Sequence, residues 1–159
     1  MSTTERKIWV REKIREEVGR LRKQGKRIVT TCGTFDILHR GHIKSIHEAK
    51  KQGDILIVCL NTDLSVKKYK GQERPIMDQR NRAEILAALG DVDYVVIFDE
   101  PDPRSILEEI KPDIHVKSKS GFKEVERGII ESNGGKIVLI EDLPGISTTK
   151  IIKKIKKEH

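Results

Sequence analysis

The sequence predicts an α/β fold in which a doubly wound, five-stranded parallel sheet carries helices on both faces. Short apolar segments alternate with amphipathic helical segments along the chain of 159 residues, a pattern typical of strand–helix–strand units with right-handed crossovers. One apolar segment, Asp54–Leu60, has no polar residue after its first position, as expected for a strand that helices cover on both sides.

The first 26 residues are expected to form a leading amphipathic helix that packs on a domain formed by residues 27–159. Apolar residues recur at near-helical spacing between Glu5 and Gln24, and Gly25 provides a stop signal. The apolar stripe consists of Ile8, Val10, Ile14, Val18 and Leu21.

Five later segments are expected to be strands, because each is short and rich in β-branched or other apolar residues. Residues 62–76 are polar and are expected to form a loop. In chain order the expected strands are Arg27–Cys32, Asp54–Leu60, Tyr94–Phe98, Ile114–Val116 and Lys136–Ile140.

Capping and stop signals delimit the helices between these strands. Gly90 ends one helix, Asp102 and Pro103 begin the next, and Ser147 caps the last. The result is a Rossmann-like arrangement, in which ligands bind beyond the carboxyl ends of the strands. The expected helices are Gly41–Lys51, Met77–Leu89, Asp102–Ile110, Lys123–Ser132 and Ser147–Lys157.

The charge distribution argues against a nucleic-acid partner. The formal charge is +7, but its basic excess lies at the two ends of the chain. Residues 1–27 hold ten Lys and Arg against four Glu, and residues 150–159 hold five Lys against one Glu. A nucleic-acid-binding domain more often carries its basic residues on one face of the domain, so these terminal charges are expected to face solvent.

The apolar segments are too short to cross a bilayer. The longest uninterrupted run, Ile55–Leu60, has six residues, whereas a membrane-spanning helix needs about 20. No apolar stretch follows the first charged residues, so no secretory signal is expected. Cys32 and Cys59 lie inside apolar segments and are expected to be buried, reduced thiols of a cytoplasmic protein.

The most informative segment follows the first strand of the predicted sheet. It contains neither of the common glycine-rich phosphate motifs, but His39 and His42 flank Gly41 where a helix is expected to begin. Glycine permits close approach of the backbone, and each imidazole can donate one N–H to a polyanion. The segment therefore favours a phosphate clamp.

Two other interpretations of these histidines stay open. They could simply cap a turn, or they could bind zinc with Cys32 and His47, although those candidates have no recognised metal-ligand spacing. His47 and His115 are expected to be packing or surface residues.

Two motifs together resemble the HxGH nucleotidyltransferase superfamily. Gly33-Thr34-Phe35-Asp36 followed by His39-Arg40-Gly41-His42 is similar to its nucleotide-binding signature. About 105 residues later, Gly145-Ile146-Ser147-Thr148-Thr149-Lys150-Ile151 is similar to its second signature. The resemblance extends over almost the whole chain, and it implies joining of a nucleotide to a phosphorylated acceptor.

Within the superfamily, the chain most resembles the D-glycero-β-D-manno-heptose 1-phosphate adenylyltransferases. Glycerol-3-phosphate cytidylyltransferases share the first motif, Lys44 and the second motif, so a CTP-dependent enzyme is the alternative, and a nucleotide-binding module without turnover is another. The segments that resemble the heptose family are Gly25-Lys26-Arg27, Asn61-Thr62-Asp63, Lys70-Gly71, Arg74-Pro75-Ile76, Arg82 and Val92–Val96.

The resemblance implies attack of a sugar-phosphate oxygen on the α-phosphorus of ATP or CTP, with magnesium and release of pyrophosphate. A phosphate monoester has a second pKa of about 6, so the nucleophile is already ionised at neutral pH. The protein must then position two anions and offset their charge. Magnesium is expected to bind through the triphosphate, without a predicted protein ligand.

The resemblance also implies roles for individual residues. His39 and His42 would act on the triphosphate as catalytic residues, Lys70 and Arg82 would be catalytic cations near the acceptor phosphate or the leaving pyrophosphate, and Asp36 would cap the turn or hold a magnesium-bound water. Other nucleotide-binding residues would be Thr34, Phe35, Lys117, Ser147, Thr148 and Thr149, and the acceptor-binding residues would be Asp36, Asp63, Lys70 and Arg82.

The chain departs from the family pattern after the fourth strand. The heptose family usually has Lys-Gly-Gly-Asp-Tyr there, whereas this chain has Lys117-Ser118-Lys119-Ser120-Gly121-Phe122. An acidic contact is therefore missing and a cation is added. Cys32 also stands where the heptose enzymes usually have asparagine. A homodimer is expected from the resemblance, with the basic terminal helices as possible subunit contacts.

Overall fold

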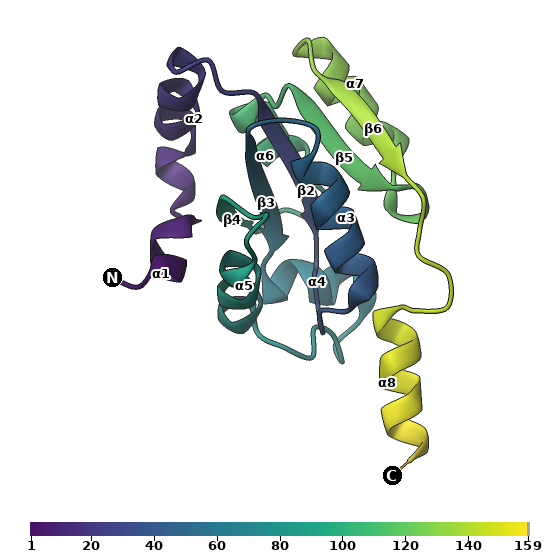
Figure 1. Ribbon diagram of the computed structural model, residues 1–159. Coiled ribbons are helices and arrows are strands. Elements are labelled where there is room, and N and C mark those ends of the chain that lie inside the picture. The colour runs from purple at the N-terminus through teal and green to yellow at the C-terminus, as the bar shows by residue number, and fades with distance from the viewer. Residues whose placement is uncertain (159) are drawn as a thin grey trace.

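The computed structural model describes residues 1–158 and contains one parallel sheet with helices on both faces (Figure 1). The α/β, Rossmann-like prediction is confirmed, but the sheet has six strands and not five. Their spatial order is β1-β4-β3-β2-β5-β6, so the order reverses between β2 and β5. The strands are β1 (Ile8–Trp9), β2 (Ile28–Gly33), β3 (Ile55–Asn61), β4 (Tyr94–Phe98), β5 (Ile114–Ser118) and β6 (Lys136–Ile140).

Eight α-helices are described within residues 1–158, and they differ in how deeply they are buried. Helix α8 has no buried residue and stands away from the sheet in Figure 1. The helices are α1 (Thr3–Lys7), α2 (Ile14–Lys23), α3 (Arg40–Lys50), α4 (Asp63–Lys70), α5 (Gln79–Ala88), α6 (Arg104–Ile110), α7 (Glu124–Ser132) and α8 (Thr148–Lys157).

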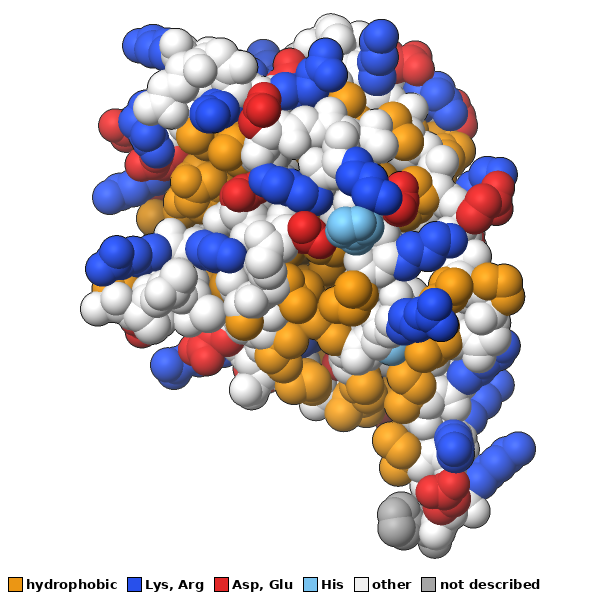
Figure 2. Space-filling view, viewed as in Figure 1, with side chains coloured by type: hydrophobic (Ala, Val, Ile, Leu, Met, Phe, Trp, Pro, Cys, Tyr) orange, Lys and Arg blue, Asp and Glu red, His pale blue; other side chains and the backbone are white. Residues whose placement is uncertain are grey.

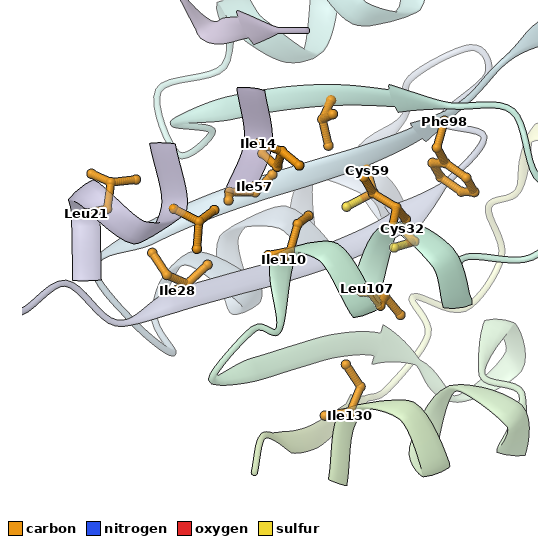
Figure 3. Close-up of a cluster of buried hydrophobic side chains, with 13 residues drawn as sticks. Ile14, Leu21, Ile28, Cys32, Ile57, Cys59, Phe98, Leu107, Ile110 and Ile130 are labelled. Carbon is orange, nitrogen blue, oxygen red and sulfur yellow. The ribbon is translucent and has the colours of Figure 1, made fainter. Parts of the chain in front are cut away.

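Two apolar clusters fill the spaces between the sheet and its helices. Alternate residues of β3 enter opposite clusters, Ile57 and Cys59 on one side and Leu56 and Val58 on the other. This double burial explains why the strand is apolar throughout. Figure 3 shows the first cluster, which joins β2, β3 and β4 to helices α2, α6 and α7 through Ile14, Leu21, Ile28, Cys32, Ile57, Cys59, Phe98, Leu107, Ile110 and Ile130.

The two cysteines lie within the first cluster. Cys32 and Cys59 are register partners on β2 and β3, and both are buried free thiols, as predicted. Hydrogen bonding with Cys32 and burial raise the pKa of the Cys59 thiol.

The predicted continuous helix over Glu5–Gln24 is wrong. The segment instead forms α1, the short strand β1, a 3-10 turn over Arg11–Lys13, and α2. Strand β1 pairs with β4, and the Trp9 ring stacks on Tyr94 with 3.6 Å between centroids. Pairing with an edge strand outweighed the helical spacing of the apolar residues, because strand preference depends on the neighbouring surface.

The prediction that residues 62–76 form only a loop is also wrong. Helix α4 begins after Thr62, whose hydroxyl accepts a hydrogen bond from the Ser65 N–H at 3.1 Å, and it ends at Gly71, where φ is +93°. Only Ser65 and Val66 of this helix are buried, so its composition resembles that of a loop. Helix α4 brings Lys70 to the end of the sheet where the strands terminate.

The surface carries charges of both signs. In Figure 2, Lys and Arg side chains are spread over the face and mixed with Asp and Glu, while hydrophobic side chains gather in its lower half. Among residues 1–158, no helix is both long and apolar enough to cross a membrane.

Candidate active site

His39 and His42 form the start of helix α3. The Nδ1 atom of His39 accepts a hydrogen bond from the Gly41 N–H at 3.1 Å, and Nδ1 of His42 accepts one from the His39 N–H at 3.3 Å. The two rings stack with 3.9 Å between centroids. Two N–H groups at the helix start are thus satisfied by the histidines themselves.

These hydrogen bonds determine which ring nitrogen carries hydrogen. A nitrogen that accepts a hydrogen bond has no proton, so the neutral form of each ring carries its hydrogen on Nε2. Burial, the neighbouring His39 and Lys70 lower the pKa of His42 to about 4, and burial also lowers the pKa of His39. At neutral pH both rings are therefore neutral donors through Nε2–H.

Gly41 is required by the close approach of the His39 ring. A Cβ atom at this position would lie 2.9 Å from Cε1 and 3.0 Å from Nδ1 of His39, and 3.7 Å from Cγ2 of Ile146. The glycine of the first motif therefore makes room for the His39 ring, whereas the contact with Ile146 of the second motif would be an ordinary van der Waals distance.

The second motif reaches the first motif directly. The Thr148 hydroxyl donates a hydrogen bond to the Asp36 carbonyl oxygen at 2.8 Å. The Ser147 hydroxyl caps helix α8 by accepting from the Lys150 N–H at 3.2 Å, and Thr149 is exposed. Of the three predicted hydroxyl residues, only Thr148 lines the same cleft as His42.

This cleft lies at the carboxyl ends of strands β2 to β5 and has a volume of about 460 Å³. It is open to solvent and continues from helix α3 to helix α7. The predicted site residues that line it are Thr34, Phe35, Asp36, His42, Lys70, Lys117 and Thr148; among its other lining residues are Cys32, Asn61, Tyr69, Arg74, Phe122 and Glu126.

Asp36 lines the cleft, but both of its carboxylate oxygens are occupied. They accept hydrogen bonds from Arg74 Nε at 2.9 Å and from the N–H groups of Ile76 and Met77 at 2.8 and 3.0 Å. Burial raises the pKa of Asp36, but the two N–H groups and the Arg74 guanidinium lower it overall. Asp36 therefore holds the segment after α4 in place, and its carboxylate is not directed at an acceptor.

Arg82 and Asp63 are not brought into the cleft. Arg82 is only 1% exposed, and its guanidinium donates to the carbonyl oxygens of Thr34 and Met77 and to Asp63 Oδ1 at 2.7 to 2.9 Å. The cation expected near the acceptor phosphate is thus buried beneath the cleft, where it ties the residue that follows β2, Thr34, to helices α4 and α5. Arg74 supplies a second cation beside Lys70 instead.

Thr34 and Phe35 form the floor of the cleft. The Thr34 hydroxyl is hydrogen-bonded to the Tyr69 hydroxyl. The Phe35 ring lies 5.6 Å from the His42 ring, centroid to centroid, and its backbone has φ of +49°. Phe35 is only 8% exposed, so its side chain supports His42.

Lys117 lies within β5, one residue before the strand ends, and not after the strand as predicted. Its ammonium donates to the Cys32 carbonyl oxygen at 2.7 Å. In the unusual segment that follows, Lys119 pairs with Glu141, and Ser120 donates two hydrogen bonds to Asp142 at 2.6 and 3.0 Å. The departure from the family pattern thus ties the turn after β5 to the segment before α8.

The two other histidines within residues 1–158, His47 and His115, lie outside the clamp, as predicted. His47 is exposed and pairs with Asp91 at 3.0 Å, and His115 is fully buried between Thr30 and Glu126. Among residues 1–158, no three His, Cys, Asp or Glu side chains are grouped to bind a metal ion.

The cleft residues without a predicted role include Arg74, Tyr69 and Glu126. Arg74 belongs to a segment that resembles the heptose family, so that resemblance could have identified it. Tyr69 follows two lysines and carries no comparable signal. Glu126 precedes the core residue Ile130 by four positions, and a charged residue at a core-facing helical position is a signal that could have been noticed.

A family model described as cytidylyltransferase-like matches residues 30–154. Among curated proteins, the bifunctional protein HldE of Syntrophotalea carbinolica is 43% identical over 151 residues, which are 94% of this chain and 31% of that protein. HldE of Citrifermentans bemidjiense is 46% identical over 140 residues, which are 87% of this chain and 29% of that protein. The chain thus spans less than a third of the length of these relatives.

The solved structures that are similar to this chain include the following two. The lipopolysaccharide core biosynthesis protein from Thermoplasma volcanium has a TM-score of 0.66 and 36% identity, and the match covers 75% of this chain and 99% of that one. Pantoate-β-alanine ligase from Francisella tularensis has a TM-score of 0.60 and 19% identity, covering 94% and 76% of the two chains. The second match supports the fold alone.

We expect His42 to remain neutral until the pH falls to about 4, because burial and the neighbouring His39 and Lys70 oppose its protonation. Since this pKa lies below the ordinary value of 6.5, the unfolded chain binds the proton first. The contribution of the neutral His42 ring to the free energy of unfolding is therefore complete above pH 6.5 and is lost as the pH falls towards 4. An NMR titration of the imidazole would measure the midpoint, with the acid-unfolded chain as reference. A midpoint near 6.5 in the folded protein would contradict this prediction.

Gly41→Ala should weaken binding of inorganic triphosphate on the order of 10-fold, the effect of losing about 1.4 kcal/mol of hydrogen bonding. The added Cβ would displace the His39 ring, while the free energy of unfolding should change by no more than about 1 kcal/mol. Calorimetric titration and chemical denaturation measure the two quantities. Gly128→Ala, in helix α7 with open space around the added Cβ, is the control and should leave triphosphate affinity unchanged; equal effects of both substitutions would argue against a specific role for Gly41.

Arg82→Met should lower the free energy of unfolding by about 3–5 kcal/mol, because it leaves Asp63 and two carbonyl oxygens without their buried donor. Arg80→Met on the same helix removes a guanidinium whose side chain is 86% exposed, and its effect should stay within about 0.5 kcal/mol. Urea denaturation measures the free energy of unfolding of both variants. Similar losses in Arg82→Met and Arg80→Met would mean that the Arg82 contacts do not stabilise the fold.

Proposed function

The chain belongs to the cytidylyltransferase-like family, and from this membership we propose that it transfers AMP from ATP to a sugar 1-phosphate of the heptose 1-phosphate kind. The products would be an ADP-sugar and pyrophosphate. One observation carries the proposal: His42 of the first motif and Thr148 of the second line the same cleft, and Thr148 bonds the backbone of Asp36. Two segments more than 100 residues apart in sequence thus meet where one triphosphate would lie.

In the proposed reaction, an oxygen of the acceptor phosphate attacks the α-phosphorus. A bond from that oxygen to phosphorus forms, the bond from the α-phosphorus to the bridging oxygen breaks, and pyrophosphate leaves with the electron pair. The acceptor is a phosphate monoester and is largely dianionic at neutral pH, so no protein base is needed. The work left to the protein is positioning and charge stabilisation.

The neutral histidines suit this task. Their Nε2–H groups would donate to the triphosphate, His42 from the wall of the cleft and His39 from the ring stacked against it. Donors that are held in place before the substrate binds need not reorganise as charge develops on the bridging oxygen. Lys70 and Arg74, which line the same cleft, would offset the charge of the acceptor phosphate and the leaving pyrophosphate.

Magnesium would enter with the nucleotide as part of the substrate. The Asp36 carboxylate is committed to Arg74 and to two backbone N–H groups, so we assign the ion to the phosphate oxygens. A bound magnesium ion would neutralise part of the charge on those phosphates.

The choice of ATP over CTP rests on the resemblance to the heptose 1-phosphate adenylyltransferases and on identities of 43% and 46% to two HldE proteins. The motifs shared with glycerol-3-phosphate cytidylyltransferases make CTP with a polyol phosphate the competing pair.

Pyrophosphate release is the direct test. We expect release with ATP and a heptose 1-phosphate, and less with CTP and glycerol 3-phosphate. His42→Ala should lower turnover on the order of 100-fold, the effect of losing one preorganised donor. A coupled assay over a panel of nucleotides and sugar phosphates measures this.

The control is His47→Ala, which removes an exposed imidazole from the same helix and should leave turnover within a few-fold. Faster release with CTP would favour the cytidylyltransferase. No release with any pair, from a folded protein that still binds ATP, would favour a binding module and overturn the enzymatic proposal.

A further inference from the structure

A row of largely buried polar side chains, Thr30, His115, Glu126 and Lys117, lies under the end of the cleft that faces helix α7. His115 and Lys117 are two residues apart on β5 and point to the same side of the sheet, towards α7. Glu126 of α7 lies opposite both: its Oε2 is 3.1 Å from His115 Nε2, and its Oε1 is 3.7 Å from Lys117 Nζ. Thr30 Oγ1 completes the row at 2.8 Å from His115 Nδ1.

The positions of the hydrogen atoms in this row of side chains follow from the burial of His115. His115 is fully buried, and burial lowers its pKa although Glu126 opposes the shift, so the ring is neutral. The neutral ring has one donor and one acceptor. Its Nε2–H donates to the Glu126 carboxylate, and its Nδ1 accepts from the Thr30 hydroxyl. The Glu126 carboxylate thus accepts from His115 and lies beside the Lys117 ammonium.

The fold alone does not require a carboxylate at position 126. Glu126 is 1% exposed and lies one helical turn before the core residue Ile130. Burying an ion pair costs desolvation energy, and an apolar residue of similar size is often as stabilising or more so. What distinguishes position 126 from an ordinary core position is that Glu126 also lines the cleft.

Lys117 is the group that this carboxylate can direct. An ammonium has three N–H donors. One is used by the Cys32 carbonyl oxygen at 2.7 Å, and a second faces Glu126. With two directions fixed on protein partners, the third N–H is available to a ligand in the cleft, which Lys117 lines with 14% of its side chain exposed.

We propose that Glu126, held by His115, is a positioning residue that fixes the Lys117 ammonium for the nucleotide. This inference rests on the proposed nucleotidyltransferase function and adds to it a determinant of nucleotide binding that comes from α7. Glu126 acts through Lys117 and does not itself take part in the transfer.

The test is Glu126→Gln. Glutamine keeps the size of the side chain and can still hydrogen-bond His115, but it loses the charge that attracts Lys117. We expect the KM for the nucleotide to rise on the order of 10-fold, with kcat and the KM for the acceptor within about 3-fold, the pattern of a binding contact that is equal in ground and transition states. Glu124→Gln, an exposed change of the same charge on the same helix, should alter none of these constants.

A double-mutant cycle with Lys117→Met tests whether Glu126 acts through Lys117. In the Lys117→Met background, Glu126→Gln should change the nucleotide KM by less than about 2-fold, because the group that it positions is already gone. Equal effects in both backgrounds would overturn the proposal. So would a Glu126→Gln variant that loses thermal stability while its nucleotide KM stays at the parent value, since the carboxylate would then serve only the fold.

Assays of the parent protein distinguish a failure of the positioning role from a failure of the proposed function on which it rests. Pyrophosphate release by the parent together with an unchanged nucleotide KM in Glu126→Gln overturns the positioning role alone. A parent protein that neither releases pyrophosphate nor binds ATP overturns both.

Discussion

One buried residue, Asp36, connects the segments that form the cleft. Its side chain is fully buried, and its carboxylate is stable there because it accepts hydrogen bonds from Arg74 and from the N–H groups of Ile76 and Met77. Its carbonyl oxygen accepts the hydroxyl of Thr148. Three segments distant in sequence, the first motif, the segment after α4 and the second motif, are thus connected through one residue.

The electrostatics of the cleft follow from this arrangement. Asp36 holds Arg74 at the cleft that Lys70 also lines, and Lys70 opposes protonation of His42. A charged His42 beside these cations would be costly, and it would also lose the Nδ1 acceptor that caps helix α3. Neutral rings therefore preserve the helix start and still present N–H donors. The clamp combines cations with neutral dipoles, and both kinds of group attract phosphate.

Much of the fold and part of the site could be predicted from the sequence, because they depend on local patterns. The five main strands have apolar runs, and the two motifs mark their own positions. Two of the predictions that failed, for β1 and for Arg82, depended on distant partners. Strand β1 exists only because β4 offers a free edge, and Arg82 is buried only because Asp63 and the Thr34 carbonyl oxygen meet it there. No local pattern in the sequence distinguishes such an arginine from one that faces a ligand.

The same reasoning applies to the acidic group of the cleft. The segment after β5 lacks the aspartate of the related families, and its Lys119 and Ser120 are used to tie down Glu141 and Asp142. A carboxylate nevertheless reaches this end of the cleft, from Glu126 of helix α7. The carboxyl edge of a parallel sheet gathers side chains from strands, turns and the helices that pack on it. Because Glu126 comes from a helix and not from the segment after β5, the charges of the cleft follow from all the elements that meet at this edge and not from one segment of the sequence.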